Sequence, residues 1–274
     1  MRPDGRSELQ SLYFSYPQFA PPDRGRNFAA ETPVAIIGAG PVGLTAALTL
    51  ASFGVPSVIL EKKSTFNDGS RAICVSRSSF HILDRLGVAE PFLEKALGWT
   101  KGRSLYRGRQ ILEFDMLHDA HEKFMPMYNI QQQYIELYLY EAARASGLID
   151  IRWHSDVTSV TPSGAHVEIG VSDPNGDYTL KAGWALAADG ARSAVRSMRG
   201  HRLKGENFEG RYVIVDVRME HDYPTIRRAL FDPASNPGGT ILIHRQPENI
   251  WRIDYQLDPD ESAESALAEA TVRS

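Results

Sequence analysis

Three glycines at a fixed spacing are the first residues in this sequence that could do chemistry. Gly38, Gly40 and Gly43 form G-x-G-x-x-G within VAIIGAGPVGLTAAL, between an apolar run and a helical pattern. The first glycine permits a tight turn, the second lets the backbone approach a pyrophosphate, and the third lets the helix pack on the strand. The free N–H groups and positive end of the helix then attract phosphates. The remaining residues of the loop are Ala39, Pro41 and Val42.

A carboxylate follows at a distance typical of dinucleotide sites. Glu61, with Lys62 beside it, comes about 20 residues after the glycines, at the end of the next apolar run. A carboxylate there can accept hydrogen bonds from both hydroxyls of an adenosine ribose, and it would repel a 2′-phosphate. The pattern therefore favours FAD or NAD over NADP at this site. The alternative is a tight turn between strand and helix with an incidental exposed glutamate.

The elements that must position these residues form one strand-helix-strand unit. The sequence predicts a strand at Val34–Ile37, a helix at Val42–Phe53 and a second strand at Ser57–Leu60. The stretch 34–60 carries no charge and is long enough to span a bilayer. Its glycines and prolines divide it into short pieces, so we expect a buried unit of a globular domain.

The pattern of alternating strands and helices continues to about residue 205. A capped helix is expected at Ser76–Leu86, with an apolar face, and a second amphipathic helix at Gln133–Ala145. The apolar face of the first of these helices comprises Phe80, Ile82, Leu83 and Leu86. Short strands are expected on both sides of the Arg107-Gly108 turn, and at 151–160, 165–171, 178–181 and 184–188, the last a buried strand.

The second half of the chain has a different character. Four strands are expected at 212–219, 227–231, 240–244 and 251–257, with no helices between them, and a helix begins near Glu261. Strands without crossover helices indicate an antiparallel sheet and therefore a separate architectural unit. The fold class is thus α/β, with a Rossmann-like domain on a parallel sheet and a partial antiparallel-sheet domain.

Composition limits the possible functions and compartments. The 274 residues carry 30 Lys+Arg against 34 Asp+Glu, so no overall positive field attracts nucleic acid. A single cysteine, Cys74, excludes an internal disulfide, and the N-terminus lacks a signal-peptide pattern, which favours the cytoplasm. Residues 1–31 are expected to be a flexible extension, whose aromatic cluster at 12–19 could pack on the domain surface.

Three segments of the sequence resemble one enzyme family. GAGPVGL, GSRAICVSRSSFHILDRLGV and AADGARSAVR are similar to segments of the flavin-dependent aromatic hydroxylases, or group A flavoprotein monooxygenases. That family includes the hydroxylases of p-hydroxybenzoate, phenol and 3-(3-hydroxyphenyl)propionate, and the resemblance covers about residues 33–258. It implies FAD as cofactor, NADH or NADPH and O2 as co-substrates, and hydroxylation of a phenolic or aromatic substrate by a flavin C4a-hydroperoxide.

The resemblance assigns roles to individual residues. Glu61 resembles the ribose-binding acid, and Arg71 an arginine beside the pyrophosphate and flavin. Gln132 is similar in place to a glutamine at the ribityl chain, Val157 to a backbone amide at the adenine, and Asp189-Gly190 to a D-G motif at the pyrophosphate and NAD(P)H site. The neighbouring glutamines, Gln131 and Gln133, leave that register open by one residue.

Each assignment has a simpler alternative. Arg71 could be a surface loop residue, and Asp189-Gly190 a turn that ends a strand. A further basic group could line a site for a phosphate-bearing reductant or form a solvated face. It comprises Arg192, Arg196 and Arg199.

Candidate catalytic residues lie in the expected antiparallel sheet. Arg252 resembles a position that faces flavin and substrate, and His244 could hydrogen-bond a phenolic oxygen and favour the phenolate. They share this region with Arg245 and Asp254, and each could instead be a polar residue on the wet face of the sheet. No metal site is expected, because His118 and His121 have no cysteine near them. Cys74 is expected to be a small packed residue.

The resemblance also divides the chain and marks a departure. It implies an extension at 1–31, an FAD-binding domain at 32–102 and 128–205, and a substrate domain at 103–127 and 206–274. The substrate domain is expected to be incomplete, because the family's later G-D-A-A-H-like segment does not occur in this sequence. Two alternatives to the monooxygenase follow: a non-catalytic FAD- or ADP-binding fragment, and an NAD-dependent dehydrogenase. The substrate and the oligomeric state stay open.

Overall fold

The computed structural model describes residues 12–25, 28–67, 72–206, 210–268 and 270–271. The chain forms two compact units, each assembled from separate segments. The α/β unit comprises Tyr16–Asp68 and Gln132–Gly205, and the β unit comprises Met1–Ser15, Gly69–Gln131 and Glu206–Ser274. Segment 69–102, which the sequence analysis placed in an FAD-binding domain, therefore groups by its contacts with the β unit.

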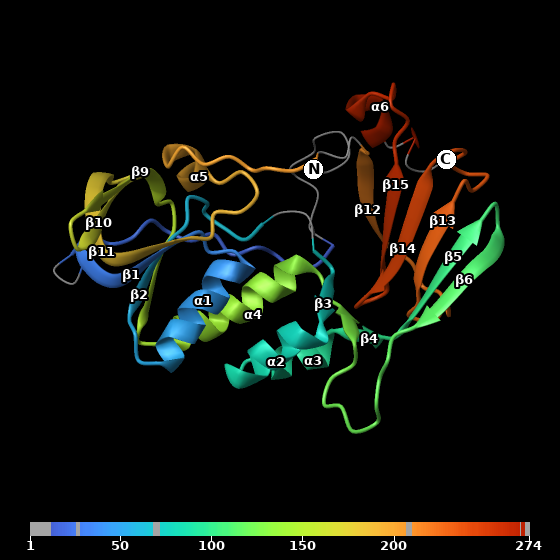
Figure 1. Cartoon of the computed structure of the whole chain (residues 1–274), viewed down its shortest axis with the longest axis horizontal. Helices are drawn as coiled ribbons and strands as arrows, with labels where there is room; N and C mark the ends of the chain where they lie inside the picture. Colours follow the sequence, from blue (N-terminus) through green and yellow to red (C-terminus); the bar gives the residue numbers. More distant parts are fainter. Residues whose placement is uncertain (1–11, 26–27, 68–71, 207–209, 269, 272–274) are drawn as a thin grey trace. The chain divides into compact units, whose positions relative to one another are not determined.

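The α/β unit contains one six-stranded sheet with strand order β8-β2-β1-β11-β10-β9. Its first four strands are parallel, and β10 and β9 continue the sheet as antiparallel neighbours (Figure 1). The strands are β1 (Glu31–Ile37), β2 (Ser57–Leu60), β8 (Ile149–Arg152), β9 (Asp156–Ser163), β10 (His166–Asp173) and β11 (Gly176–Ala187). Helices α1 (Pro41–Ser52) and α4 (Gln132–Ala145) pack against each other, and α5 (Ala194–Met198) follows β11.

Burial explains the uncharged stretch that opens this unit. β1 lies between β2 and β11, and Ala35, Ile36 and Ile37 are at most 5% exposed. All four residues of β2 are buried. A strand covered on both faces needs apolar side chains throughout. The expectation that residues 34–60 form a strand-helix-strand unit is confirmed, and no helix among the described residues is long and apolar enough to span a bilayer.

Two expectations for this sheet are wrong. Residues 151–160 form the end of β8 and the start of β9, because the chain turns at His154, whose φ is 56°. The strands expected at 178–181 and 184–188 are one strand, β11, which pairs with β10 through its first part and with β1 through its second. Trp184, expected in a buried strand, is 76% exposed.

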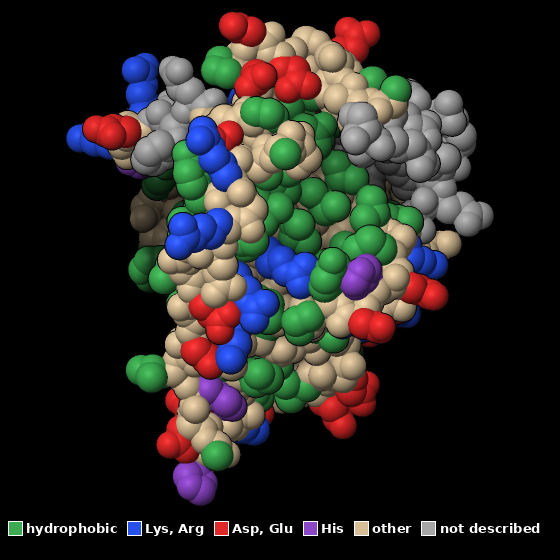
Figure 2. Space-filling view, turned by 90° about the vertical axis from the view of Figure 1, so that its right-hand side faces the viewer, with side chains coloured by type: hydrophobic (Ala, Val, Ile, Leu, Met, Phe, Trp, Pro, Cys, Tyr) green, Lys and Arg blue, Asp and Glu red, His purple; other side chains and the backbone are tan. Residues whose placement is uncertain are grey.

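The β unit is built on a second six-stranded sheet, of order β12-β15-β14-β13-β5-β6. It is antiparallel as expected, except that β13 pairs in parallel with β5, which comes from much earlier in the chain. Its strands are β5 (Lys101–Tyr106), β6 (Arg109–Asp115), β12 (Tyr212–Arg218), β13 (Arg227–Phe231), β14 (Thr240–Gln246) and β15 (Ile250–Gln256). On one face, α6 (Ala263–Leu267) packs through a cluster that contains Val213, Leu257 and Ala266. Figure 2, which faces this unit, shows hydrophobic side chains gathered beside Lys and Arg side chains.

A smaller part of the β unit surrounds the helix expected at 76–86. It consists of the three-stranded sheet β3-β7-β4 with helices α2 (Arg77–Arg85) and α3 (Glu90–Lys95). The three strands are β3 (Cys74–Ser76), β4 (Leu97–Trp99) and β7 (Met127–Asn129). The Ser76 side chain caps α2 by accepting a hydrogen bond from the Ser79 amide. Phe80 and Leu83 are buried as expected, but Ile82 is 41% exposed, because it lies outside the face of α2 that packs.

The aromatic cluster at 12–19 packs on the two units, as its composition allowed. In the β unit, the Tyr13 hydroxyl donates a hydrogen bond to Asp216 Oδ2. In the α/β unit, the Phe19 ring stacks on Trp153 with ring centroids 4.1 Å apart. The aromatic cluster at 12–19 thus supplies packing contacts to both units.

Phe80 should be a large contributor to the stability of the β unit. Its ring is fully buried and lies 4.1 Å from the Tyr128 ring and 5.5 Å from the Phe124 ring, between centroids. We expect Phe80→Ala to lower the free energy of unfolding by about 3–5 kcal/mol in urea denaturation. Ile82→Ala on the exposed side of the same helix is the control, with an expected change within about 0.5 kcal/mol. Equal losses in the two variants would contradict the packing described.

Candidate functional site

The glycine loop has the geometry of a phosphate cradle. Gly38 has a φ of 108°, and a Cβ there would lie 2.6 Å from the Ala188 carbonyl oxygen. A Cβ on Gly43 would lie 1.9 Å from the Gly38 carbonyl oxygen, so only glycine lets α1 begin this close to β1. Gly40 is the N-cap of α1, has no side-chain cap, and offers open space where a Cβ would be. Two glycines therefore serve packing, and the third leaves room for a ligand at the helix N-terminus.

The Glu61 carboxylate fixes this loop from the end of β2. Its Oε2 accepts a hydrogen bond of 2.8 Å from the Ala39 amide, and its Oε1 accepts one of 3.0 Å from the Lys63 amide. A carboxylate has about four acceptor positions, so each oxygen can accept a further bond from a ribose hydroxyl. The alternative of an incidental exposed glutamate is wrong, since Glu61 is half-buried and braces the loop. Lys62, next to it, is exposed.

The buried carboxylate of Glu136, at the start of α4, was not predicted from the sequence. Glu136 is 1% exposed and accepts hydrogen bonds from the Asn67 amide at 2.9 Å and from Gln132 Nε2 at 2.6 Å. The Gln132 side chain, expected to face a ribityl chain, therefore already has a partner in the protein. The side chains of Gln131 and Gln133 are fully buried, and their amide atoms have no hydrogen-bond partner. The four-residue spacing from Gln132 to Glu136 on one helix face was the available signal.

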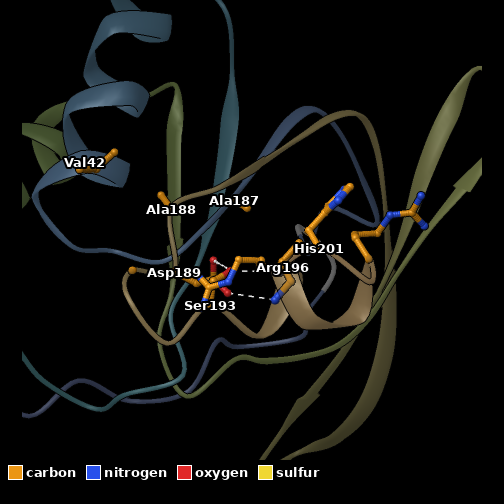
Figure 3. Close-up of a pocket in the computed structure, with 10 residues that line it drawn as sticks. Val42, Ala187, Ala188, Asp189, Ser193, Arg196 and His201 are labelled. Atoms are coloured by element: carbon orange, nitrogen blue, oxygen red, sulfur yellow. Dashed lines mark hydrogen bonds between the residues drawn. The ribbon is translucent and has the colours of Figure 1, made fainter. Parts of the chain in front are cut away.

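The Asp189-Gly190 segment combines a turn with a wall of a pocket. Asp189 Oδ1 accepts a hydrogen bond of 2.6 Å from Ser193 Oγ, and Oδ2 accepts one of 3.1 Å from the Val195 amide. Gly190 takes a φ of 80°. The same segment lines a cavity of about 490 Å³ that Val42 of the glycine loop also borders (Figure 3). Asp189-Gly190 therefore forms a turn at the end of a strand and also lines a pocket, so the two interpretations of this motif do not exclude each other.

Positive charge gathers along this pocket. Arg196 and Arg199 both line it, together with His201. Arg196 NH2 donates to the Ala191 carbonyl at 2.8 Å, which fixes the guanidinium beside the cavity. Arg192 is exposed and does not line it. Of the three arginines at helical spacing, two are therefore placed where a phosphate could bind.

Two other residues, Val157 and Arg71, were expected in the nucleotide site. Val157 lies in β9, is 7% exposed, and belongs to the apolar core of the α/β unit. Its register partner in β10 is Val171, next to an irregularity in the pairing. Arg71 lies outside the described residues.

The β unit carries a buried row of polar residues across three strands. Arg252 is 1% exposed, and its Nε and NH2 donate to Asp216 Oδ1 and Oδ2 at 3.0 and 2.9 Å. Arg252 also stands opposite His244 in the strand register. The alternative that Arg252 and His244 lie on a wet sheet face is wrong, since both are buried. Arg245 points to the other face, where NH1 donates to the Tyr223 carbonyl.

Burial and two arginines keep His244 neutral. Removal from water, followed by the charges of Arg227 and Arg252, lowers the pKa of His244 to about 4. Its Nδ1 is buried without a hydrogen-bond partner. At neutral pH this imidazole carries no charge, and it can donate a hydrogen bond to a ligand or accept one from it.

Two neighbours of His244 extend this polar face. Gln246 is fully buried, and both its amide atoms lack a hydrogen-bond partner. Asp254 Oδ1 is also buried without a hydrogen bond, and it lies 4.0 Å from Arg252 Nε in an ion pair. Burial raises the pKa of Asp254, although the charge of Arg252 lowers it. The alternation of strand side chains puts His244 with Gln246, and Arg252 with Asp254, on one face. Gln246, Asp216 and Arg227 were not predicted from the sequence, since only the pairing of strands distant in the chain brings them to this face.

Cys74 does not match its expectation. It is exposed on β3 rather than packed, and its Sγ lies 3.4 Å from Asn129 Oδ1. Among the described residues, no group of three or more His, Cys, Asp and Glu side chains could hold a metal ion.

The glycines make a matched pair for a test of stability. We expect Gly43→Ala to lower the free energy of unfolding by about 3 kcal/mol, because its methyl group meets a carbonyl oxygen. Gly40→Ala should change it by less than about 0.5 kcal/mol, because that methyl group meets open space. Thermal unfolding of the protein without added cofactor measures both. A Gly43→Ala protein as stable as wild type would contradict the close start of α1.

The buried His244 should make stability depend on pH. Its pKa is lower in the folded chain than the ordinary 6.5, so folding favours the neutral form. The stabilisation is complete above pH 6.5 and is lost as the pH falls towards about 4, with a total near 3 kcal/mol. Urea denaturation at several pH values measures this loss. His244→Gln should lose less stability over the same range, and an unchanged dependence in that variant would contradict the assignment.

Comparison with known proteins identifies the fold of this site. The model of a family described as an FAD binding domain matches residues 31–272. The crystal structure of p-nitrophenol 4-monooxygenase PnpA from Pseudomonas putida DLL-E4 superposes with a TM-score of 0.78 at 27% identity. That match covers 90% of this chain and 61% of the other. The flavin-dependent monooxygenase PieE, solved with FAD and substrate, shares the fold at 23% identity and a TM-score of 0.78, over 89% of this chain and 45% of that one.

Curated sequences give the same family. Para-nitrophenol 4-monooxygenase of Pseudomonas sp. (strain WBC-3) is 28% identical over 88% of this chain and 58% of its own length. A 3-(3-hydroxy-phenyl)propionate/3-hydroxycinnamic acid hydroxylase of Burkholderia vietnamiensis (strain G4 / LMG 22486) is 30% identical over 89% of this chain and 44% of its own. The chain spans about half the length of such relatives. The resemblance drawn from the sequence is confirmed, and this chain belongs to the FAD-binding-domain family that includes the flavin-dependent aromatic monooxygenases.

Proposed function

We propose that this chain is the FAD-binding and part of the substrate-binding portion of a monooxygenase that hydroxylates a phenolic compound with O2 and NADH or NADPH. The main observation behind this proposal is the glycine loop, which Glu61 holds through the Ala39 amide. This loop has open space at Gly40 and a helix N-terminus without a side-chain cap. Relatives named para-nitrophenol 4-monooxygenase and 3-(3-hydroxy-phenyl)propionate/3-hydroxycinnamic acid hydroxylase support the reaction class.

The residues present fit FAD. The loop Gly38–Gly43 would hold the pyrophosphate, and the Glu61 oxygens would accept the ribose hydroxyls. Buried Gln133, with no partner for its amide, is a further candidate contact, while Gln132 would act through Glu136. The backbone of Val157 at the adenine, the Asp189-Gly190 turn at the pyrophosphate, and Arg71 and Lys62 complete the proposed set. When bound, FAD supplies hydride acceptance and oxygen activation.

The charges of this chain suit a negatively charged reductant. Arg196 and Arg199 line the cavity beside the glycine loop, where they would bind a phosphate of NADH or NADPH. Asp189 holds the turn that carries this segment, since it caps α5 through Ser193 and Val195.

The polar face of the β unit suits a phenol. His244, neutral at physiological pH, would hydrogen-bond the phenolic oxygen through an imidazole nitrogen. The positive charges of Arg252 and Arg227 beside it would favour the phenolate over the phenol. Arg252 is held in place by Asp216, so it would act through its field rather than by a direct bond.

The proposed setting follows from composition. We place the protein in the cytoplasm because its single cysteine needs no oxidising compartment. A small aromatic molecule and O2 are the proposed partners, and the net charge of −4 argues against nucleic acid.

Titration with FAD tests the proposal. We expect the purified chain to bind FAD stoichiometrically, seen as a change in flavin fluorescence and in the visible spectrum. Gly40→Ala should weaken this binding at least tenfold, about 1.4 kcal/mol, because its methyl group enters the space for the pyrophosphate while the fold is unchanged. Phenol and 4-nitrophenol are then tested for stimulated NAD(P)H oxidation in the longest available form of the protein.

The two measurements separate the outcomes. No FAD binding by a folded chain would refute the proposed function. FAD binding that Gly40→Ala leaves unchanged would place the cofactor elsewhere. FAD binding without phenol-stimulated oxidation in a protein of the relatives' full length would favour a non-catalytic binding protein.

A further inference from the structure

A short N-terminal segment is built into the nucleotide end of the α/β unit. The strap, residues 16–19, runs beside the loop 61–67 that follows β2. The Phe19 amide donates to the Ser64 carbonyl at 2.8 Å, and Ser64 Oγ lies 3.1 Å from Gln18 Oε1. The Phe19 carbonyl accepts a hydrogen bond of 2.8 Å from His154 Nε2. The strap is thus tied to two separate turns of the unit.

The Phe19 ring anchors the strap in an aromatic cluster. It stacks on Trp153 at 4.1 Å with an angle of 13° between the planes. Its centroid lies 4.8 Å from that of Tyr140 and 5.4 Å from that of Phe66. These rings come from α4, from the turn after β8 and from the loop 61–67. Phe66 and Trp153 are only 2% and 5% exposed, so one residue of the strap joins three elements.

A continuous set of hydrogen bonds connects the strap to the glycine loop. The His154 amide donates to the Lys63 carbonyl at 3.0 Å, and the Ser155 amide to the Glu61 carbonyl at 2.9 Å. The Lys63 amide in turn donates to Glu61 Oε1. The other oxygen of that carboxylate holds the Ala39 amide. The position of the Glu61 side chain therefore depends on the two turns that the strap fixes.

These turns would be poorly ordered by themselves. Residues 62–67 form bends without helix or strand, and ordering such backbone costs conformational entropy. His154 has a φ of 56°, a conformation that L-residues seldom adopt. Its bond to the Phe19 carbonyl and the stacking of Trp153 on Phe19 supply contacts that favour this arrangement.

We propose that the strap is a positioning element of the adenosine end of the cofactor site, and that Phe19 preorganises Glu61 for the ribose. The identity of the ligand rests on the proposed function, but the ordering of the loop does not. A cofactor then binds a site that is already formed, which increases affinity without a direct contact to the strap. Because the strap acts on the adenosine half, ADP should report its effect as well as FAD.

Three variants in the full chain test this role. Phe19→Ala removes the anchor, and Phe19→Tyr keeps a ring that can stack. Phe28→Ala is the matched control: Phe28 is also a half-buried N-terminal phenylalanine on the same unit, but it packs on Tyr178 and Arg152 instead. Hydrogen exchange of the cofactor-free proteins reports the order of residues 61–67. Titrations with FAD and with ADP report affinity.

We expect Phe19→Ala to speed amide exchange in residues 61–67 and to raise the Kd for both FAD and ADP about tenfold, the effect of one preorganising element. Phe19→Tyr should restore both properties, and Phe28→Ala should leave both near wild type even where it lowers the melting temperature.

Each opposite result is informative. Unchanged exchange in Phe19→Ala would overturn the proposal whether or not FAD binds. Faster exchange with unchanged affinity would show that the strap orders the loop without serving the site, which also overturns it. A wild-type chain that binds neither FAD nor ADP would refute the proposed function and, with it, the role at a cofactor site. An equal loss of affinity in Phe28→Ala would reduce the effect to general stability.

Discussion

The hydrogen bond between the Glu61 carboxylate and the Ala39 amide sets the shape of the glycine loop, on which the proposed cofactor site depends. It joins the end of β2 to the turn after β1, at the place where α1 begins only because Gly43 has no side chain. The same carboxylate organises the turn at Lys63. One residue thus fixes the shape of the loop and presents acceptors beside it. In the same loop, Gly38 adopts a positive φ that glycine accommodates without strain, and a Cβ at Gly40 would meet open space.

The β unit keeps a charged side chain buried within its sheet. Arg252 is paired with Asp216 through two hydrogen bonds, which offset the cost of burying a guanidinium. Burial, followed by the charges of Arg227 and Arg252, lowers the pKa of the nearby His244 and keeps it neutral. The orphaned amide of Gln246 and the carboxylate of Asp254 lie on the same face. Unsatisfied buried groups of this kind are costly in a finished core, and they are expected where a ligand supplies the partners.

The features that were predicted correctly are those that depend on residues close together in the sequence. The glycine spacing, the apolar strands β1 and β2, the capped helix α2 and the four late strands depend on neighbours in the sequence, and all were found. What failed depended on distant partners. β11 is one strand because it changes neighbours from β10 to β1. The partners of the N-terminal aromatic residues, Trp153 and Asp216, come from much later in the chain. The aromatic cluster at 12–19 indicated that this segment could pack on a surface, but the sequence does not identify the residues that it contacts.

The parallel pairing of β5 with β13 has a consequence for the order of events during synthesis. The hairpin of β5 and β6 is complete as soon as residue 115 leaves the ribosome, but β5 gains its second neighbour only after Arg227–Phe231 are made. In the interval the whole α/β unit can form, since its last strand is β11. Throughout that time the edge of β5 that later pairs with β13 has no strand partner in this sheet, and an unpaired strand edge is open to pairing with another chain. The nascent chain is therefore most open to mispairing and to chaperones between these two points of translation.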